Sequence, residues 1–462
     1  MMMWRGKNES MYSTSFLQKL AASTFRNPAR LFVLGFGLLI LLGSILLSLP
    51  ISTASGKGLP YVDALFTATS AVCVTGLVVV DTGTTFSLFG KIVIMLLIQI
   101  GGLGFMTMAT LFSLILGRKI TFRERVIIQE SFNHATLEGI VKLVQRVLLY
   151  TFVLEGIGAL LLALYWLPSM GWKKALFFGI FHSISSFNNA GFDILGNFQS
   201  LTPYVSDPYI NLVVISLVIL GGLGFFVLSE LFHFRFRKRL SLHTKVVLMT
   251  SMTLLIAGAV FIFLFEYTNP KTLGSLDWAG KVLAPIFQST VARTQGMNTL
   301  PIGDMRQATL LILILLMFIG ASPGSTGGGV KTTTFMVLVG AVWSMIQGKR
   351  DVVFFKQRLP ERLIFRALSV TLISFLLVFS TSILLSMTER ADFLTILFES
   401  TSAFGTVGLS MGLTPHLTVF GKLILSFTMF AGRVGPLTFA LALILRRREE
   451  HFRYNEGKVM IG

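Results

Sequence analysis

The sequence predicts an all-α polytopic membrane protein. We expect four helix, pore-loop, helix repeats around a single central pore, with eight transmembrane helices and four re-entrant half-helices. Three observations predict this class. The 462 residues are 53% hydrophobic and 13% charged, with a mean hydropathy of +0.77, whereas soluble proteins carry about 25% charged residues. Uncharged apolar stretches recur, and roughly 20 such residues suffice to cross a bilayer. A glycine motif also recurs four times between these stretches.

The distribution of charge along the chain predicts its topology. The apolar stretches cover residues 31–49, 92–117, 246–265, 309–330, 367–388 and 434–445. Basic residues concentrate in five segments, and acidic residues lie in the connections between those segments. By the positive-inside rule the basic segments are cytoplasmic, so the chain enters and leaves the membrane four times with both ends inside. The predicted cytoplasmic segments are 1–30, 118–146, 234–245, 349–366 and 446–462, and the predicted repeats are 31–117, 147–233, 246–348 and 367–445.

Several other classes of protein are excluded by the sequence. The first apolar run follows a basic region, but no small-residue cleavage site follows it, so we expect a retained helix and not a signal peptide. The single cysteine, Cys73, excludes an intramolecular disulfide and is expected to be a small packing residue. The basic residues that give the net charge of +18 lie between apolar spans, so we expect them to contact anionic lipid and not nucleic acid. The six histidines are dispersed without metal-ligand spacing, so no enzyme is expected.

A short, polar-studded apolar stretch in each repeat ends at a glycine. Aligned on Gly76, Gly191, Gly296 and Gly408, each has a Ser or Thr six residues before the glycine and a large apolar residue after it. The four aligned segments are Thr69–Leu77, Ile184–Phe192, Ser289–Met297 and Thr401–Leu409. Their nearly constant separation indicates an internal repeat. Each stretch is too short to cross the hydrocarbon and is predicted to be re-entrant.

Unwound backbone at membrane depth is tolerated only where it lines a water- or ion-filled path. Four such loops around one axis supply a ring of carbonyl oxygens, and glycine permits the positive φ that turns carbonyls inward. A dehydrated monovalent cation is the expected occupant.

The helix after each loop carries a glycine-rich patch, for which we expect close helix packing. The four patches are Gly101–Gly104, Gly221–Gly224, Gly320–Gly324 and Gly432–Gly435. In the third repeat the run Ala321–Gly329 cannot remain a regular helix, because Gly and Pro are the poorest helix formers. The same run is similar to a phosphate-binding P-loop, but Val330 separates the last glycine from Lys331 and no strand is expected before it. We therefore expect no nucleotide hydrolysis.

These residues together resemble the Trk/Ktr/HKT superfamily of potassium transporters, over nearly the whole chain from about Pro28 to Arg448. The segments Thr69–Leu77, Gly320–Thr334 and Phe430–Pro436 are most similar to the bacterial Ktr-type membrane subunit. The resemblance implies potassium uptake through a channel-like pore, with K⁺ bound at filter carbonyls and Na⁺ as a possible activator. The implied filter residues are Val74, Thr75, Gly76, Asn189, Ala190, Gly191, Thr294, Gln295, Gly296, Thr406, Val407 and Gly408.

The resemblance also implies an intramembrane gating loop at 320–334 beneath the filter. Its implied gate residues are Gly320, Pro323, Gly324, Gly327, Gly328, Gly329, Lys331 and Arg433. A single common glycine per filter strand, with chemically unequal strands, predicts weaker discrimination against sodium. The implied partners are a second copy of the chain, in a homodimer, and a cytosolic nucleotide-binding ring that senses ATP or ADP. The ring is expected to dock on segments 235–239 and 349–358 of this chain. The location implied is the cell membrane.

Charged residues inside spans are functional candidates, because a charge in hydrocarbon is costly. Arg433 is predicted to project below the filter, the alternative being a structural pair, and Lys331 lies either at the gate or near the membrane surface. Glu155 and Glu230 are expected to pair with basic neighbours or to lie near an interface. Glu399 either adds field to the filter or forms a structural hydrogen bond, and Arg293 is expected to brace the filter from behind. Two alternatives for function remain open, a secondary active carrier of another small solute and a sodium-permeable member of the same superfamily.

Overall fold

The computed structural model describes residues 28–104, 140–237 and 239–435. The predicted cytoplasmic segment 446–462, almost all of the predicted segments 1–30 and 118–146, and the apolar stretch 434–445 beyond residue 435 lie outside the described residues. Within the described ranges the fold is helical, with one small hairpin of two antiparallel strands. This agrees with the predicted all-α class.

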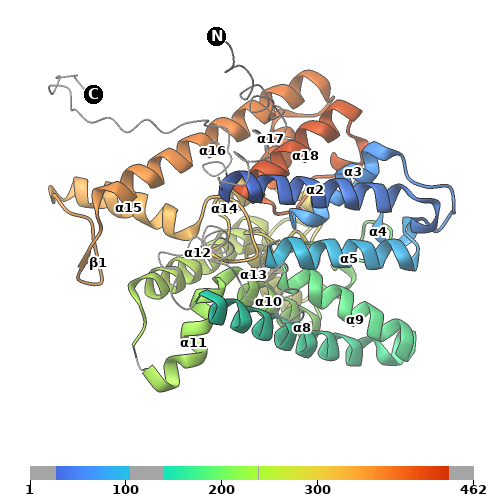
Figure 1. The fold of residues 1–462 in the computed structure, drawn as a ribbon, viewed down its shortest axis with the longest axis horizontal. Coiled ribbons are helices and arrows are strands. Elements are labelled where there is room, and N and C mark those ends of the chain that lie inside the picture. Colours follow the sequence, from blue (N-terminus) through green and yellow to red (C-terminus); the bar gives the residue numbers. More distant parts are fainter. Residues whose placement is uncertain (1–27, 105–139, 238, 436–462) are drawn as a thin grey trace, which may run out of the picture.

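The chain forms four units in sequence order, each with a long helix, a shorter helix and a further helix (Figure 1). Unit one comprises α2 (Pro28–Ser48), η1 (Pro50–Ser52), α3 (Tyr61–Val72), α4 (Thr82–Thr85) and α5 (Leu88–Leu103). Unit two comprises α8 (Ile140–Met170), α9 (Trp172–Phe187), η2 (Thr202–Tyr204), α10 (Pro208–Leu223) and α11 (Phe225–Arg237).

Units three and four continue the same order. Unit three comprises α12 (Leu242–Glu266), α13 (Trp278–Val291), η3 (Ile302–Asp304), α14 (Gln307–Phe318) and α15 (Thr332–Ile346). Strands β1 (Val353–Phe354) and β2 (Gln357–Arg358) form the hairpin, in which Val353 pairs with Arg358. Unit four comprises α16 (Glu361–Thr388), α17 (Phe393–Gly405), η4 (Thr414–His416) and α18 (Val419–Val434).

Local sequence signals explain where the helices after the short helices begin and end. Ser87 caps α5 by accepting from the Gly90 amide, and Thr418 caps α18 by accepting from the Gly421 amide, as expected for N-cap side chains. Three of these helices stop at a glycine with positive φ, at Gly104, Gly224 and Gly435. Such a conformation is strained for other residues and is a common way to end a helix.

These helix ends correct the predicted spans. The apolar run 92–117 was expected to continue as one helix, but α5 ends at Leu103, and α10 and α11 bend by 105° at their break. In unit four the helix is Val419–Val434, which precedes the apolar stretch 434–445. Three described helices are long and apolar enough to cross a membrane, within α8, α12 and α16, and the bent α10–α11 pair is a fourth candidate. The break in the third unit therefore has a shorter counterpart in unit two, at Gly224.

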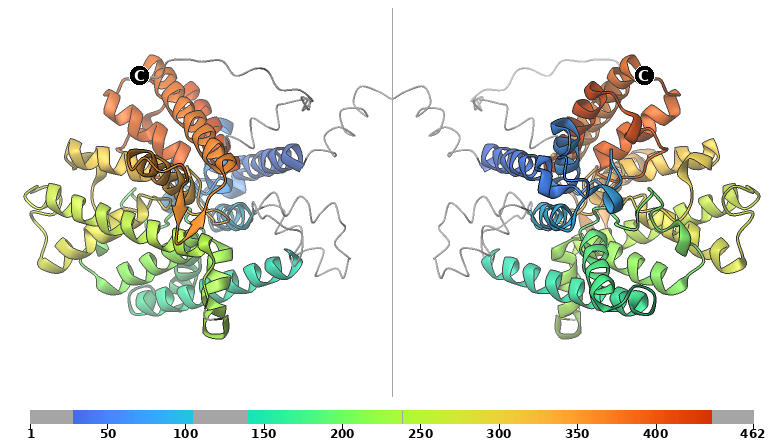
Figure 2. Two further views of the ribbon diagram at one scale, coloured as in Figure 1. Left: turned by 90° about the vertical axis from the view of Figure 1, so that its left-hand side faces the viewer. Right: turned by 90° about the vertical axis from the view of Figure 1, so that its right-hand side faces the viewer.

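The short helices connect the units into a closed ring. Each packs against the following helix of the preceding unit, in the pairs α9 with α5, α13 with α10 and α17 with α14. The ring closes where α3 of unit one packs against α18 of unit four, and Figure 1 shows these blue and red helices side by side. In Figure 2, units two and four lie on opposite sides of the molecule, as do units one and three.

The distribution of polarity is inverted relative to a water-soluble protein. Large apolar side chains of the long helices are exposed, for example Leu38 at 69% and Phe375 at 56%. The ends of the short helices are instead buried and rich in hydroxyls, including Ser70, Ser185 and Ser402. Apolar surfaces of this extent are expected to face lipid, so the fold is that of a multi-pass membrane protein.

Candidate functional site

The four aligned glycines meet in a ring. Gly76, Gly191, Gly296 and Gly408 have φ values of 87°, 72°, 74° and 95°. A Cβ atom added at Gly76 would lie 2.5 Å from the Ala190 carbonyl oxygen of the next unit. Added Cβ atoms at the other three would overlap the next unit's carbonyl in the same way, namely Gly191 with Gln295, Gly296 with Val407, and Gly408 with Thr75. The sequence repeat is therefore a closed spatial repeat, with a backbone carbonyl beside each glycine.

A second position in the loops is also left-handed. Val74, Asn189 and Thr406, each two residues before the glycine, have φ values of 58°, 59° and 50°. Positive φ is unusual for β-branched residues such as Val and Thr, and strain of this kind gathers at functional sites. Thr294, the corresponding residue of the third unit, lacks it. The filter-like segments thus share one conformation in three units and depart from it in one.

Hydroxyl groups hold the loops to their short helices. Ser70 accepts from the Gly76 amide at 3.0 Å, and Ser402 accepts from the Gly408 amide at 3.1 Å. In unit two, Ser185 donates to the Phe192 carbonyl at 2.6 Å. In unit three, Thr290 instead bonds within its own helix, to Ile286. The Ser or Thr found six residues before each glycine therefore supports the loop in three units.

The arrangement suits a cation. Each short helix ends just before its loop, and a helix C-terminus carries a partial negative charge. The ring itself presents backbone carbonyl oxygens, which are the ligands of potassium filters. The buried hydroxyl of Thr75 and the buried amide of Gln295 have no hydrogen-bond partner among the described residues. These groups remain available to an occupant of the ring.

The predicted interruption of unit three is present as a loop between α14 and α15. Residues 319–331 fold back on themselves, because Ile319 and Val330 form a parallel bridge and the Val330 amide donates to the Phe318 carbonyl at 3.1 Å. Gly324 and Gly329 have positive φ. Gly320 packs so closely on Gly328 that a Cβ would overlap its carbonyl. Glycine is thus required at the neck of this loop.

The loop touches three of the four aligned glycine segments. The Gly328 amide donates to Thr406 Oγ1 at 3.0 Å, and the side chains of Asn189 and Thr326 are hydrogen-bonded at 3.2 Å. A Cβ added at Gly327 would overlap the Thr294 side chain. The three contacted residues each lie two positions before a ring glycine. The loop therefore lies against the side of the ring that the short helices approach.

Two half-buried cations hold the loop. Arg433 of α18 donates to the Thr326 carbonyl of the loop, and to the carbonyls of Gly101 and Gly102 in unit one. Lys331 donates to the carbonyls of Gly327 at 2.6 Å and Gly328 at 3.4 Å. Neither forms an ion pair among the described residues. Arg433 is thus an anchor from loop to scaffold, and Lys331 is an internal brace.

The remaining loop contacts lie at the break between α10 and α11. The Ser322 amide donates to the Gly222 carbonyl at 3.1 Å, and the Phe225 amide donates to the Gly324 carbonyl at 2.9 Å. Pro323 lies here as well, since a Cβ added at Gly224 would approach its carbonyl oxygen to 2.6 Å. All eight predicted gate residues therefore lie in or against this loop.

The glycine patches after the loops permit close packing, as predicted. Gly101, Gly221 and Gly432 lie directly against the last carbonyls of the short helices, at Val72, Phe187 and Phe404, and a Cβ at each would overlap the carbonyl. A side chain there would push the helix end away from the ring.

The other charged candidates have mainly structural partners. Glu155 accepts from Gln99 at 3.1 Å and from Asn188 at 2.8 Å, and Glu230 accepts from Ser241 and Thr244. Neither glutamate forms an ion pair among the described residues, so the predicted pairing with basic neighbours is not found there. The glutamates hydrogen-bond to amides and hydroxyls instead, which sequence spacing does not reveal.

Glu399 accepts from Ser410, Thr414 and the Met411 amide, so its structural alternative holds. An ion pair between Asp63 and Lys422, 2.6 Å long, joins units one and four. Sequence reasoning missed this pair because its members are far apart in the chain. The hydrogen bond between Thr326 and Asn189 was missed for the same reason.

One carboxyl group follows the ring in unit two. Asp193 comes two residues after Gly191, on the part of the segment that leads away from the loop contacts. Its carboxylate accepts from the Leu195 amide at 3.1 Å. Burial raises the pKa of Asp193 to about 6, and the neighbouring charge of Asp81 adds to the rise.

Comparison with known proteins assigns the family. A family model described as "TrkH: Cation transport protein" matches residues 36–453. The Ktr system potassium uptake protein B of Bacillus subtilis is 46% identical over 435 residues, covering 94% of this chain and 97% of that protein. The potassium/sodium uptake protein NtpJ of Enterococcus hirae is 39% identical over 442 residues, covering 94% and 97%.

A solved structure gives the same fold. The crystal structure of the potassium transporter TrkH from Vibrio parahaemolyticus superposes with a TM-score of 0.67 at 19% identity, covering 89% of this chain and 84% of that one. The matched family model and relatives span nearly the whole length described above. The chain therefore belongs to the TrkH family of cation transport proteins.

Proposed function

We propose that this chain takes up potassium across the cell membrane through a single central pore, with the ring of backbone carbonyls as its selectivity filter. The observation that carries the proposal is the closed ring, in which the carbonyls of Thr75, Ala190, Gln295 and Val407 each lie beside a glycine of the neighbouring unit. The names of the relatives, which are potassium and potassium/sodium uptake proteins, support the same ion. In this proposal the four units supply eight transmembrane helices, and α3, α9, α13 and α17 are the re-entrant half-helices.

The filter selects by replacing the hydration shell of the ion. Potassium loses its water to the carbonyl ring, while the C-termini of four short helices stabilise its charge. The four strands are unequal, because Thr294 lacks the left-handed conformation of its counterparts and Gln295 carries an amide beside the ring. An irregular ring is expected to discriminate against sodium less sharply than a symmetric one. Sodium then acts either as a second permeant ion or as an activator.

The loop 320–334 is the proposed gate. It lies against filter residues Asn189, Thr294 and Thr406, so an ion leaving the ring meets the loop first. Arg433 and Lys331 add two positive charges on this side, which oppose a cation. Conduction then requires the loop to leave its contacts with Thr406 and with Arg433.

Regulation is proposed to come from outside the membrane. The basic segments 235–239 and 349–358 face the cytoplasm in this topology, as do both chain ends, and 353–358 includes the β1–β2 hairpin. We expect two copies of the chain to form a homodimer on a cytosolic ring that binds ATP or ADP, with anionic lipid at the remaining basic surface. Charge reversal in both segments is expected to abolish copurification with the ring. Unchanged copurification would remove these segments as the docking site.

The decisive experiment measures ion uptake into liposomes that contain the purified chain alone. Potassium and rubidium are expected to enter well above sodium under an imposed potential. Equal entry of sodium would favour a sodium-permeable member of the family. Entry that depends on a cytosolic partner would assign control to the loop. Saturable uptake of an uncharged solute, with no ion current, would favour a carrier and overturn the proposal.

A further inference from the structure

Arg293, two residues after the end of α13, is a half-buried cation with few hydrogen-bond partners. Its Nη2 donates to Ser251 Oγ at 3.3 Å and its Nη1 donates to the Ser251 carbonyl at 3.4 Å, while the buried Nε has no partner among the described residues. Both bonds are longer than the usual 2.7–3.2 Å. The ion pairs found in the described part of the chain do not include Arg293. A guanidinium with five donors is thus left with two weak bonds.

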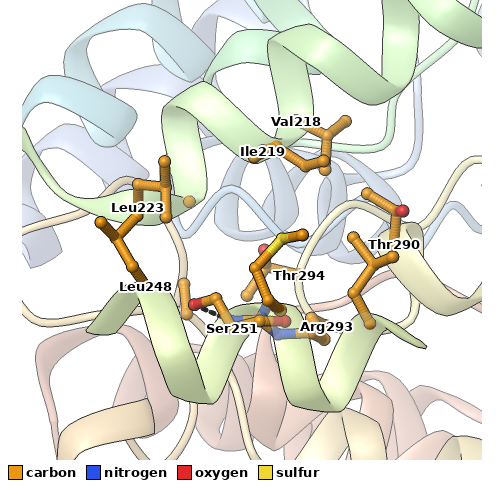
Figure 3. Close-up of a pocket in the computed structure, with 12 residues that line it drawn as sticks. Val218, Ile219, Leu223, Leu248, Ser251, Thr290, Arg293 and Thr294 are labelled. Carbon is orange, nitrogen blue, oxygen red and sulfur yellow. Dashed lines mark hydrogen bonds between the residues drawn. The ribbon is translucent and has the colours of Figure 1, made fainter. Parts of the chain in front are cut away.

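A cavity of about 90 Å³ opens beside this guanidinium. Figure 3 shows Arg293 and Ser251 on one side of it, with Val218 and Ile219 on the opposite side. The walls are mainly hydrocarbon from α10 and α12, and the polar lining comes from Ser251, Thr290, Thr294 and Arg293. The cavity therefore combines one cationic group with an apolar chamber.

One wall of the cavity reaches the exposed apolar surface of α12. Met252, which lines it, is 55% exposed on α12. The exposed apolar residues Met249 and Ile256 flank Met252 along the same helix. A molecule entering here comes from the bilayer and not from water.

Other charged side chains show what Arg293 lacks. Arg433 donates to three backbone carbonyls, and the carboxylate of Glu155 accepts from two side-chain amides. An arginine whose donors are incompletely paired is costly to keep in hydrocarbon. An acidic group bound through two parallel hydrogen bonds removes much of that cost, because guanidinium and carboxylate geometries match.

We propose that this cavity binds an anionic amphiphile from the membrane, with its acidic group on the Nε and one Nη of Arg293. The first methylenes of its hydrocarbon chain fill the chamber along Leu248 and Leu255, and the rest of the chain lies in the bilayer. The bound molecule also touches the filter at Thr294 and the loop at Ala321, both of which line the cavity. Its presence then affects the filter and the gate together.

The test is photolabelling of the purified full-length chain in neutral-lipid nanodiscs with a diazirine derivative of palmitic acid. Labelled residues are identified by mass spectrometry and are expected within 218–223 and 248–255. Arg293→Gln is expected to lower this labelling about tenfold, equivalent to about 1.4 kcal/mol of binding. Leu248→Trp fills the chamber, leaves Arg293 in place and is expected to have the same effect. Arg390→Gln, at an exposed arginine, is the matched control and should leave labelling unchanged.

Competition identifies the acidic group and its source. Displacement of the label by palmitate alone assigns the site to a free fatty acid, and displacement by phosphatidylglycerol as well extends it to anionic phospholipid. Methyl palmitate, which lacks the charge, is expected not to compete. Equal competition by methyl palmitate, or full labelling of Arg293→Gln, would overturn the proposal. Because binding is read without transport, this result is independent of the outcome for the proposed filter.

Discussion

The ring of filter segments and the loop beneath it are neighbours built in different ways. The ring is made of four similar copies, and its close contacts join glycine to backbone carbonyl. The loop occurs once, and polar bonds connect it to its neighbours, among them those with Arg433, Thr406 and Gly222. In the ring, close backbone packing prevents the segments from shifting. In the loop, the hydrogen bonds can break one at a time.

The difference matches the separate tasks that the proposed function gives to the two regions. A ring that selects an ion by the positions of its oxygens must be rigid, and tight backbone packing from four sides provides this. A gate must have two arrangements that differ by only a few kcal/mol. Charge-assisted hydrogen bonds at about 1.5–3 kcal/mol each supply a cost of that size. Substitutions in the ring should therefore change ion selectivity, whereas substitutions in the loop should change ion flux.

The largest effect is expected from Gly76→Ser, Gly296→Ser or Gly408→Ser. A side chain at these positions meets both a strained positive φ, costing about 1–3 kcal/mol, and a carbonyl of the next unit. The preference for potassium over sodium should fall by about tenfold or more, measured as uptake of each ion into liposomes. Gly37→Ser is the matched control, because a Cβ at Gly37 meets nothing within 4 Å. Unchanged ion preference in all three variants would refute the filter.

Arg433→Gln tests the role of the loop. The variant loses the charge-assisted bonds to Thr326, Gly101 and Gly102, so the loop is released from the scaffold. Rubidium flux through the chain alone should rise about tenfold, while the potassium to sodium ratio should change little. Arg390→Gln, at an exposed arginine, serves as the control. A fall in selectivity without a rise in flux would mean that Arg433 supports the ring and not the gate.

Repeated features were easier to predict from the sequence than single contacts. The fourfold glycine pattern predicted the ring residues, because a repeat in the chain becomes a repeat in space. The Gly and Pro content of 321–329 likewise predicted the loop, whose flanking helices end at Phe318 and begin at Thr332. The partners of Glu155 and Lys422 could not be predicted from the sequence. The partner of Glu155 depends on helix rotation, and that of Lys422 depends on closure of the ring between units one and four. The helix ends at Gly104, Gly224 and Gly435 were also missed, since a lone glycine within an apolar run does not reveal its φ.

Thr406→Val addresses the point where the two regions touch. The substitution keeps the shape of the side chain in the ring and removes the acceptor for the Gly328 amide. Loss of one neutral hydrogen bond costs about 1 kcal/mol, so rubidium flux should rise about fivefold, less than for Arg433→Gln. Thr371→Val, in α16 outside the ring and the loop, is the control, because the hydroxyl of Thr371 also has no partner among the described residues. Equal increases in both variants would mean that loss of the bond to Gly328 is not what raises the flux.

The smallest expected effect concerns pH at the far side of the ring. Burial raises the pKa of Asp193 to about 6, so its carboxylate is charged at about pH 7.5 and mostly protonated at about pH 5. Acidification then removes a negative charge near the ring, and the apparent affinity for potassium should fall by a few-fold. Asp193→Asn should show the low affinity at both pH values, as measured by the concentration dependence of rubidium uptake. If the variant kept the pH dependence of the parent chain, the titrating group would lie elsewhere in the protein.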